Sequence, residues 1–229
     1  MSDYNSVNEE IKAQNEKVKQ MSLRKRLQHY WYYNKWILFA AIGAILLIYF
    51  IIDSMLTYNK TFYVTGVFIN CGASPEREKE LEQAFADAYG INTDTYSVDF
   101  DYSLSYDTEF VDSATAYTPV KMVAYSEGHV GDFVLCDEES FGFFANNGYF
   151  ADLSEVLSEE QFTAYEPYLY YYDAGDLRGS IPTAIRLTDI SRLQQAGCYL
   201  YGTDDILFTV FYLSDHKNHA LEALEFFMQ

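Results

Sequence analysis

Carboxylate side chains are the groups in this sequence whose types and spacing most resemble a site for chemistry. Asp99, Asp101, Asp107 and Glu109 supply oxygen ligands of the kind that Ca²⁺ binds. Their spacing does not match an EF-hand loop, and alternation along a strand with one solvent-facing side explains Asp99 and Asp101. We therefore expect no metal site at these residues.

Other arrangements resemble catalytic or metal-binding groups, and each has a simpler explanation. His216 and His219 lie one helical turn apart, but a metal site needs a third ligand and an open position. Glu138 and Glu139 are adjacent, so they do not face each other on a helix. Residues 124–128 resemble a nucleophile elbow but end a predicted helix, whereas the elbow follows a strand. With no phosphate-binding or dinucleotide-binding motif either, the sequence predicts neither an enzyme nor a cofactor.

Strands and helices alternate along residues 62–229 and must position any site. Apolar, β-branched runs predict strands over 62–70, 95–104, 132–136, 183–188 and 206–213. Between them, capping residues and apolar periodicity predict helices over 74–89, 107–127, 138–147 and 216–229, with a capping box over 158–161. The alternation predicts an α/β fold, in which a mixed, partly parallel sheet is covered by helices.

Charge is distributed unevenly along the 229 residues. The formal net charge is −19, with +3 in residues 1–36, −1 from Asp53 and −21 in residues 57–229. So acidic a chain is not typical of a nucleic-acid binder, which needs a basic surface. Because 49% of the residues are hydrophobic and 18% are aromatic, the composition also excludes a disordered acidic chain.

An uncharged apolar run from Trp36 to Ile52 separates the two parts. Counted from Tyr32, its helix would measure about 31 Å, which matches a hydrocarbon core of roughly 30 Å. A buried core helix is one alternative and a cleaved signal peptide another, but no cleavage site follows the run. The basic flank orients the N-terminus inward. We therefore predict a cytoplasmic segment over 1–31, a transmembrane signal anchor over 32–56 and an extracytoplasmic α/β domain over 57–229, which makes a single-pass protein of the cell membrane.

Several motifs of residues 62–229 resemble those of one protein family. They are Gly131–Asp137 with an aspartate at each end of the strand, Gly148–Leu153 after the next helix, Ile181–Thr183, and the strand and helix of Ile206–Phe227. Together they resemble the extracellular solute-binding proteins of bacterial ABC importers. The aromatic stretch Leu27–Trp36 resembles the segment that leads into the anchor of small Gram-positive membrane proteins.

The resemblance implies a single lobe of the periplasmic-binding-protein fold. Family members have two lobes that close on a ligand, but only about 30 residues separate Leu153 from Pro182 here, too few for a second lobe. Ligands of open α/β sheets bind at the carboxyl ends of the strands. The matching positions, where plain loop and capping roles are the alternative, are Gly72, Ala73, Ser74, Asp137, Glu138, Pro182 and Thr183.

Cysteines and tyrosines leave two questions open. Cys71 and Cys136 would both lie at strand ends, within reach of a disulfide, although we favour buried thiols for them and for Cys198. Tyrosine offers a broad contact area with one polar end, which suits a protein interface or the edge of a core. The clustered candidates for a partner interface are Tyr165, Tyr168, Tyr170, Tyr171 and Tyr172.

These features lead to two hypotheses. The first is a non-enzymatic, membrane-anchored domain that binds a partner protein, accessory to an ABC importer or an envelope complex. The alternative is an anchored receptor for a small solute such as a sugar or a peptide. Neither hypothesis involves a nucleic acid, a metal or a cofactor.

Overall fold

The computed structural model describes residues 22–58, 60–107, 113–173, 175, 179–199 and 205–229, together with Glu9, Lys12 and Glu16. The chain divides into two compact units, Met1–Asn59 and Lys60–Gln229. Glu109, one of the oxygen ligands considered above, lies outside the described residues.

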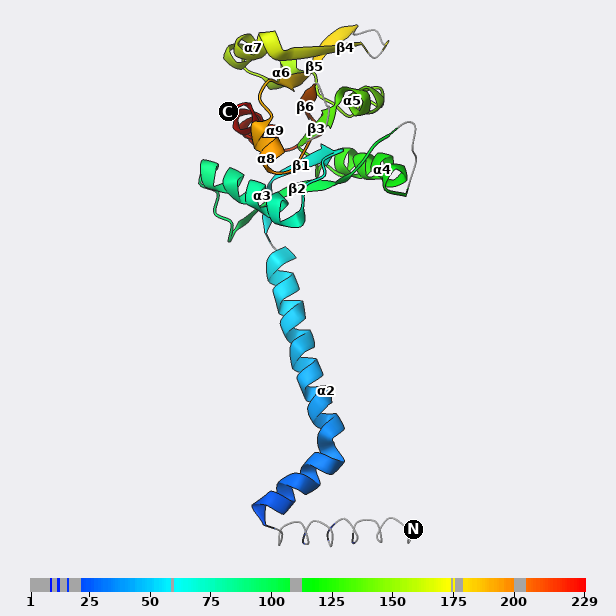
Figure 1. Cartoon of the computed structure of the whole chain (residues 1–229), viewed down its shortest axis with the longest axis vertical. Coiled ribbons are helices and arrows are strands. Elements are labelled where there is room, and N and C mark those ends of the chain that lie inside the picture. Colours follow the sequence, from blue (N-terminus) through cyan, green and yellow to red (C-terminus); the bar gives the residue numbers. More distant parts are fainter. Residues whose placement is uncertain are drawn as a thin grey trace. The chain divides into compact units, whose positions relative to one another are not determined.

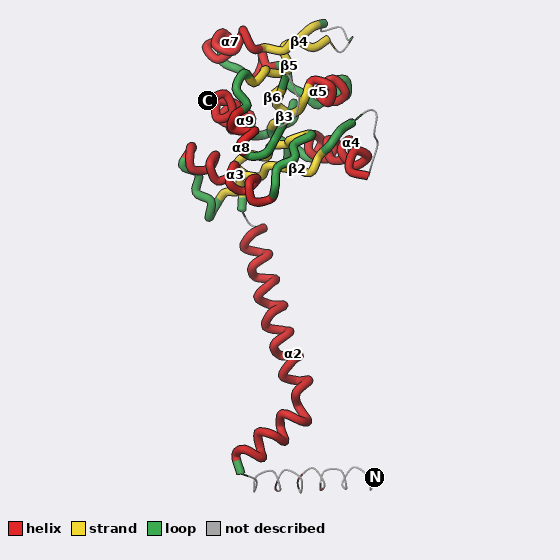
Figure 2. The backbone as a smooth tube through the Cα atoms, viewed as in Figure 1, coloured by secondary structure: helices red, strands yellow, loops and turns green. Residues whose placement is uncertain are grey.

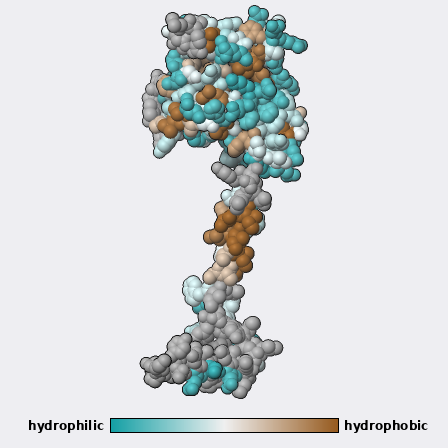
Figure 3. All heavy atoms as spheres, turned by 180° about the vertical axis from the view of Figure 1, so that it is seen from behind, coloured by the Kyte–Doolittle hydropathy of each residue, from teal (hydrophilic) through white to brown (hydrophobic). Residues whose placement is uncertain are grey.

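The first unit consists, in its described part, chiefly of helix α2, Leu23–Tyr58. The run predicted over Tyr32–Ile52 lies within it. Large apolar side chains along α2 are exposed, among them Trp36 at 75% and Phe50 at 74%, and Figure 3 shows a hydrophobic band there. Among the residues that the structure describes, no helix has both the length and the apolar character needed to cross a membrane.

A sheet of six strands, in the order β2-β1-β3-β6-β5-β4, forms the centre of the second unit. Strand β1 is parallel to β2 and to β3, whereas the pairs β3–β6, β6–β5 and β5–β4 are antiparallel. This confirms the mixed, partly parallel sheet. The strands are β1 (Thr61–Ile69), β2 (Tyr96–Leu104), β3 (Phe133–Asp137), β4 (Leu169–Asp173), β5 (Ser180–Leu187) and β6 (Ile206–Val210).

Helices cover both faces of the sheet, as Figures 1 and 2 show. One face packs against α3 (Pro75–Tyr89), α6 (Leu153–Val156), α7 (Glu159–Tyr165), α8 (Ser191–Gln195) and α9 (Lys217–Met228). The other packs against α4 (Ser113–Glu127) and α5 (Glu138–Ala145). A short 3₁₀ helix, η1 (Glu166–Tyr168), leads into β4.

The two cores follow from the alternation of side chains along each strand. In β1, Val64 and Phe68 point to the face covered by α3 and α9, and Val67 and Ile69 to the face covered by α4 and α5. Phe68 packs among aromatic rings, with its centroid 5.3 Å from that of Phe100. The high aromatic content therefore fills the interior.

Several helix termini follow the predicted sequence signals. Helix α3 begins at Pro75, without a capping hydrogen bond from the Ser74 side chain, and ends at Gly90 in the left-handed region with φ of 63°. Ser158 and Gln161 form the predicted capping box of α7. The last helix begins at Lys217 with His216 as its N-cap, one residue later than the predicted start.

The cysteines pair differently from the sequence-based alternative. Cys71 and Cys198 form a disulfide, and Cys136 is a buried free thiol whose pKa is raised by burial. Buried thiols were therefore the correct prediction for Cys136 only. The partner was missed because Cys198 follows α8, and nothing in the spacing indicates that α8 returns to the end of β1.

Candidate functional site

The carboxyl ends of β1, β3 and β5 meet at one edge of the sheet, which we call the carboxyl edge. Asp137 of β3 and Leu187 of β5 both pair with Ile206 of β6, so they lie at the same level. Strand β1 is parallel to β3, with Phe68 opposite Leu135, which places Asn70 beside Asp137. A site at this edge can therefore draw on several loops.

Asn70 joins three of these segments. Its backbone lies in the left-handed region, with φ of 61°, which asparagine tolerates better than most residues. Its Nδ2 donates to Asp137 Oδ2 (2.7 Å) and to the Tyr106 carbonyl (2.9 Å), and its Oδ1 accepts from the Tyr106 N–H (2.8 Å). Asn70 therefore fixes the loop after β2 against the end of β3.

The Asp137 carboxylate accepts hydrogen bonds from Asn70 and Ser140 and can still accept others. Its Oδ1 accepts the Ser140 N–H at 2.8 Å, which caps α5. An ionised carboxylate offers about four lone-pair positions. Asp137 can therefore accept further hydrogen bonds from a ligand's hydroxyl or amino groups without losing its structural partners.

An aromatic surface lies next to these polar groups. The rings of Tyr106 and Phe143 are stacked with centroids 4.6 Å apart, and Phe143 is 40% exposed. Glu138 on α5 accepts a hydrogen bond from the Tyr170 hydroxyl (2.7 Å), and Arg186 of β5 lies 5.0 Å from the Tyr170 ring centroid. The edge thus combines one exposed ring with several carboxylates.

The buried side chain of Tyr199 contacts the backbone of two strands near the carboxyl edge. Its hydroxyl is buried within hydrogen-bond distance of the carbonyl oxygens of Ile69 (2.9 Å) and Leu135 (3.0 Å), and burial raises its pKa. Because it directly follows Cys198, the disulfide to Cys71 holds Tyr199 in place. Ile69 at the end of β1 and Leu135 within β3 are therefore connected through one phenol.

The sequence-predicted ligand residues separate into two groups. Gly72, Ala73 and Ser74 follow β1, and Asp137 and Glu138 follow β3, so these five share the carboxyl edge. A Cβ atom at Gly72 would meet no atom within 4 Å, so packing does not require glycine there. A ligand role for these residues remains a prediction.

Pro182 and Thr183 are the exception. Both are buried inside β5, several residues before its carboxyl end, and the Thr183 carbonyl accepts from Thr209 Oγ1 at 2.6 Å. The family resemblance placed them at the carboxyl edge. They lie in the first half of β5, whose carboxyl end is Leu187, so they are nearer the opposite edge.

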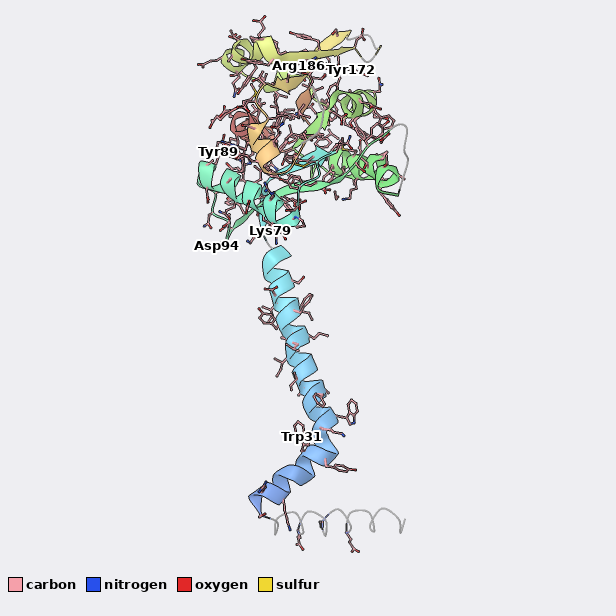
Figure 4. The ribbon with its side chains drawn as sticks, in the orientation of Figure 1. Trp31, Lys79, Tyr89, Asp94, Tyr172 and Arg186 are labelled. Atoms are coloured by element: carbon pink, nitrogen blue, oxygen red, sulfur yellow. A yellow bond between two sulfur atoms is a disulfide. The ribbon has the colours of Figure 1, made fainter. Side chains whose placement is uncertain are left out.

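Most of the clustered tyrosines pack against the cores. Tyr165 and Tyr168 lie against the core under α9, and Tyr170 and Tyr172 against the core under α5. The Tyr172 hydroxyl donates to the Gly142 carbonyl at 3.1 Å, and Figure 4 labels this tyrosine. Only Tyr171 among these five is more than half exposed, at 51%. An interface role for the cluster remains a prediction.

Asp101 of β2 is occupied by protein partners. Asp101 accepts from Lys121 Nζ (3.0 Å) and from the Tyr125 hydroxyl (2.7 Å), and these hydrogen bonds lower its pKa against the effect of burial. Within the described ranges, no three His, Cys, Asp or Glu side chains form a group suited to a metal ion.

The edge strand β2 is partly covered by Glu82 of α3. Its Oε1 accepts the Phe100 N–H at 3.0 Å, and burial raises its pKa to about 7. Since the unfolded carboxyl ionises near 4.5, the unfolded state loses its proton first as the pH rises. The free energy of unfolding should therefore decrease as the pH rises from about 4.5 to about 7.

Glu82→Gln tests this dependence, because the amide oxygen can still accept from Phe100. We expect the variant to unfold with a free energy about 1–2 kcal/mol higher than the wild type at about pH 8, with no difference near pH 4. Urea unfolding of the full chain at both pH values measures it. Glu80→Gln, an exposed change on the same helix, is the control and should show no such difference.

A second polar cluster lies at the opposite edge of the sheet. Asp132, which is fully buried, accepts from the Thr65 N–H (2.8 Å) and from Ser214 Oγ (2.7 Å), with His216 Nδ1 at 3.5 Å. Burial raises the pKa of Asp132, while these partners oppose that rise. His219 Nδ1 lies 2.6 Å from the Tyr63 carbonyl. The contacts explain Asp132 and both histidines structurally.

Comparison with known proteins gives little beyond this geometry. No family model matches the chain, and no curated protein matches it. The solved structures with similarity include the ABC substrate-binding protein Lmo0181 from Listeria monocytogenes in complex with cycloalternan, at 18% identity and a TM-score of 0.33. They also include the GacH receptor of Streptomyces glaucescens GLA.O, at 17% identity and a TM-score of 0.29.

Each of these alignments covers 56% of this chain and 29% of the other. The chain therefore matches less than a third of the length of either structure. At TM-scores this low, the similarity carries no argument about function.

Proposed function

We propose that the chain is a non-enzymatic receptor domain that binds a small solute, such as a sugar or a short peptide, at the carboxyl edge. The observation that carries the proposal is the convergence there of Asn70, Asp137 and the exposed ring of Phe143. A ring face with nearby carboxylate acceptors suits a sugar or a short peptide.

Charge narrows the class of solute. Asp137, Glu138 and Glu139 lie together at the start of α5, in a part of the chain with net charge −21. This field opposes anionic ligands. The solute is therefore neutral or cationic, and a neutral oligosaccharide or an oligopeptide with a free amino group fits best.

Thermal unfolding of the full chain against saccharides and oligopeptides tests the proposal. A ligand at about 100 times its Kd should stabilise the protein by about 2.7 kcal/mol. We expect Asp137→Asn and Phe143→Ala each to weaken binding about tenfold, because one removes a charged acceptor and the other a ring face. Tyr117→Ala, which removes an exposed ring on α4, should bind normally.

Two results would contradict this function. One is the absence of stabilisation by every saccharide and oligopeptide. The other is a ligand that binds equally well to the wild type and to both carboxyl-edge variants, since its site would then lie elsewhere.

Membrane anchoring is part of the proposal and rests on sequence. The run Tyr32–Ile52 includes residues whose side chains the structure does not describe, and Arg24, Lys25 and Arg26 precede it. The disulfide Cys71–Cys198 supports an oxidising compartment. The protein should resist carbonate extraction from membranes, and protease added to intact cells should digest Lys60–Gln229. Release by carbonate would overturn the anchor.

Docking of a partner protein is a second candidate function. The observation that favours it is the exposed side chain of Tyr171 on β4, the strand at one side of the six-stranded sheet. A photocrosslinking amino acid at Tyr171 should capture one envelope protein in intact cells, whereas the same group at Tyr117 should not. Equal capture from both positions would count against a specific partner.

A further inference from the structure

A groove between α3, α8 and α9 lies apart from the residues that define the carboxyl-edge site. Its volume is about 580 Å³, within the range of small-molecule sites. Leu81 and Ala84 of α3, Ala196 after α8 and Phe226 of α9 give it an apolar lining. The Tyr89 hydroxyl donates to the Glu222 carbonyl at 2.7 Å, which ties α3 to α9 beside the groove.

Two arginines face this groove, and backbone carbonyls hold both in place. Arg77 Nη1 donates to the Gln195 carbonyl, and Arg192 Nη1 donates to the Phe226 carbonyl at 2.6 Å. The guanidinium of Arg192 lies 4.0 Å from the Phe226 ring centroid. A guanidinium has five N–H donors, so each arginine keeps donors for a ligand.

Neither arginine forms an ion pair with a carboxylate in the part of the chain that the structure describes. Within the residues that the structure describes, the ion pairs involve Lys121, His129, Arg186 and His216, not Arg77 or Arg192. Two carboxylates of α3, Glu80 and Asp87, also line the groove, and Asp87 accepts from Gln83 Nε2 at 2.8 Å. Hydrogen bonds to backbone carbonyls leave further N–H donors on both guanidinium groups.

We infer that the groove binds a monoanionic carboxylate with an apolar body. The carboxylate would accept from the free donors of Arg77 and Arg192, and the body would cover the side chains of Leu81, Ala84 and Phe226. Guanidinium and carboxylate form charge-assisted, often bidentate, hydrogen bonds. The surrounding negative charge disfavours ions of higher charge, so a carboxylate is preferred over a phosphate dianion.

Three probes separate the two parts of this recognition. They are 3-phenylpropionate, which has the charge and the body, 3-phenylpropionamide, which has only the body, and propionate, which has only the charge. The full chain, labelled at its alanine methyl groups and kept in a non-ionic detergent, is titrated by NMR. We expect 3-phenylpropionate to shift the methyl resonances of Ala84, Ala88 and Ala196, and the other two probes to bind at least about tenfold more weakly.

Variants test the role of the arginines. Arg77→Gln should weaken 3-phenylpropionate about tenfold, and Arg192→Lys, which keeps the charge but loses the fork, should weaken it about threefold or more. Lys79→Gln removes the same charge from α3 outside the groove, at the position labelled in Figure 4, and should change affinity about twofold or less. Arg77 is exposed, so its variant should fold normally.

Several outcomes would overturn the inference. They are no methyl shifts with 3-phenylpropionate, equal binding of 3-phenylpropionamide, unchanged affinity in Arg77→Gln, or tighter binding of phenyl phosphate than of 3-phenylpropionate. These outcomes are independent of the solute site at the carboxyl edge. Asp137→Asn, a variant of that site, should leave the affinity of the groove for 3-phenylpropionate unchanged.

Discussion

Replacing Cys71 and Cys198 together with serine is expected to lower the free energy of unfolding by about 5 kcal/mol. The disulfide joins residues 127 positions apart, so its loss restores much conformational entropy to the unfolded chain. The variant also frees the segment that carries Tyr199, whose hydroxyl lies between the ends of β1 and β3. Denaturant unfolding of the full chain measures the stability.

Reduction supplies the control for this prediction. Dithiothreitol should destabilise the wild type by a similar amount and have no effect on the double variant. Solute affinity at the carboxyl edge should fall in both reduced wild type and variant. A wild type whose unfolding is insensitive to reduction would contradict the disulfide.

Asp132→Ala should lower the free energy of unfolding by about 2–4 kcal/mol. The carboxylate accepts from the Thr65 N–H of β1 and from Ser214 Oγ, so its removal leaves buried donors without an acceptor. Urea unfolding at neutral pH measures the loss.

Ser214→Ala provides the matched comparison for Asp132. It removes one of these partners and leaves the carboxylate bonded to Thr65, so it should cost about 1 kcal/mol. A larger loss in Ser214→Ala than in Asp132→Ala would show that the carboxylate is not the centre of this cluster.

Much of the fold can be predicted from local pattern. The apolar runs that became β1, β3 and β6 are largely buried, and the helix starts follow from Pro75 in α3 and from the capping box at Ser158 in α7. Strand β4 was missed because its tyrosines alternate poorly and a β-bulge interrupts the register between Tyr170 and Tyr171. Local pattern also cannot give strand order, which depends on packing between distant segments.

The candidate site was only partly predictable for the same reason. Asp137 and Glu138 follow a recognisable strand, so the rule about carboxyl ends finds them. Asn70 was noted only as the end of a strand, because its role depends on Tyr106, which is 36 residues away. Phe143 and Tyr199 carry no local pattern at all, since an exposed ring and a buried phenol look alike in sequence.

The contact between Glu82 and the Phe100 amide bears on self-association. An end strand with free amides can pair with the same strand of another molecule and start a fibre. In β2, the carboxylate already takes the amide that such pairing would use. A protonated Glu82 carboxyl keeps an oxygen that can accept, so protonation near neutral pH leaves the Phe100 N–H paired. Loss of the whole Glu82 side chain would instead free this N–H for pairing with a strand of another molecule.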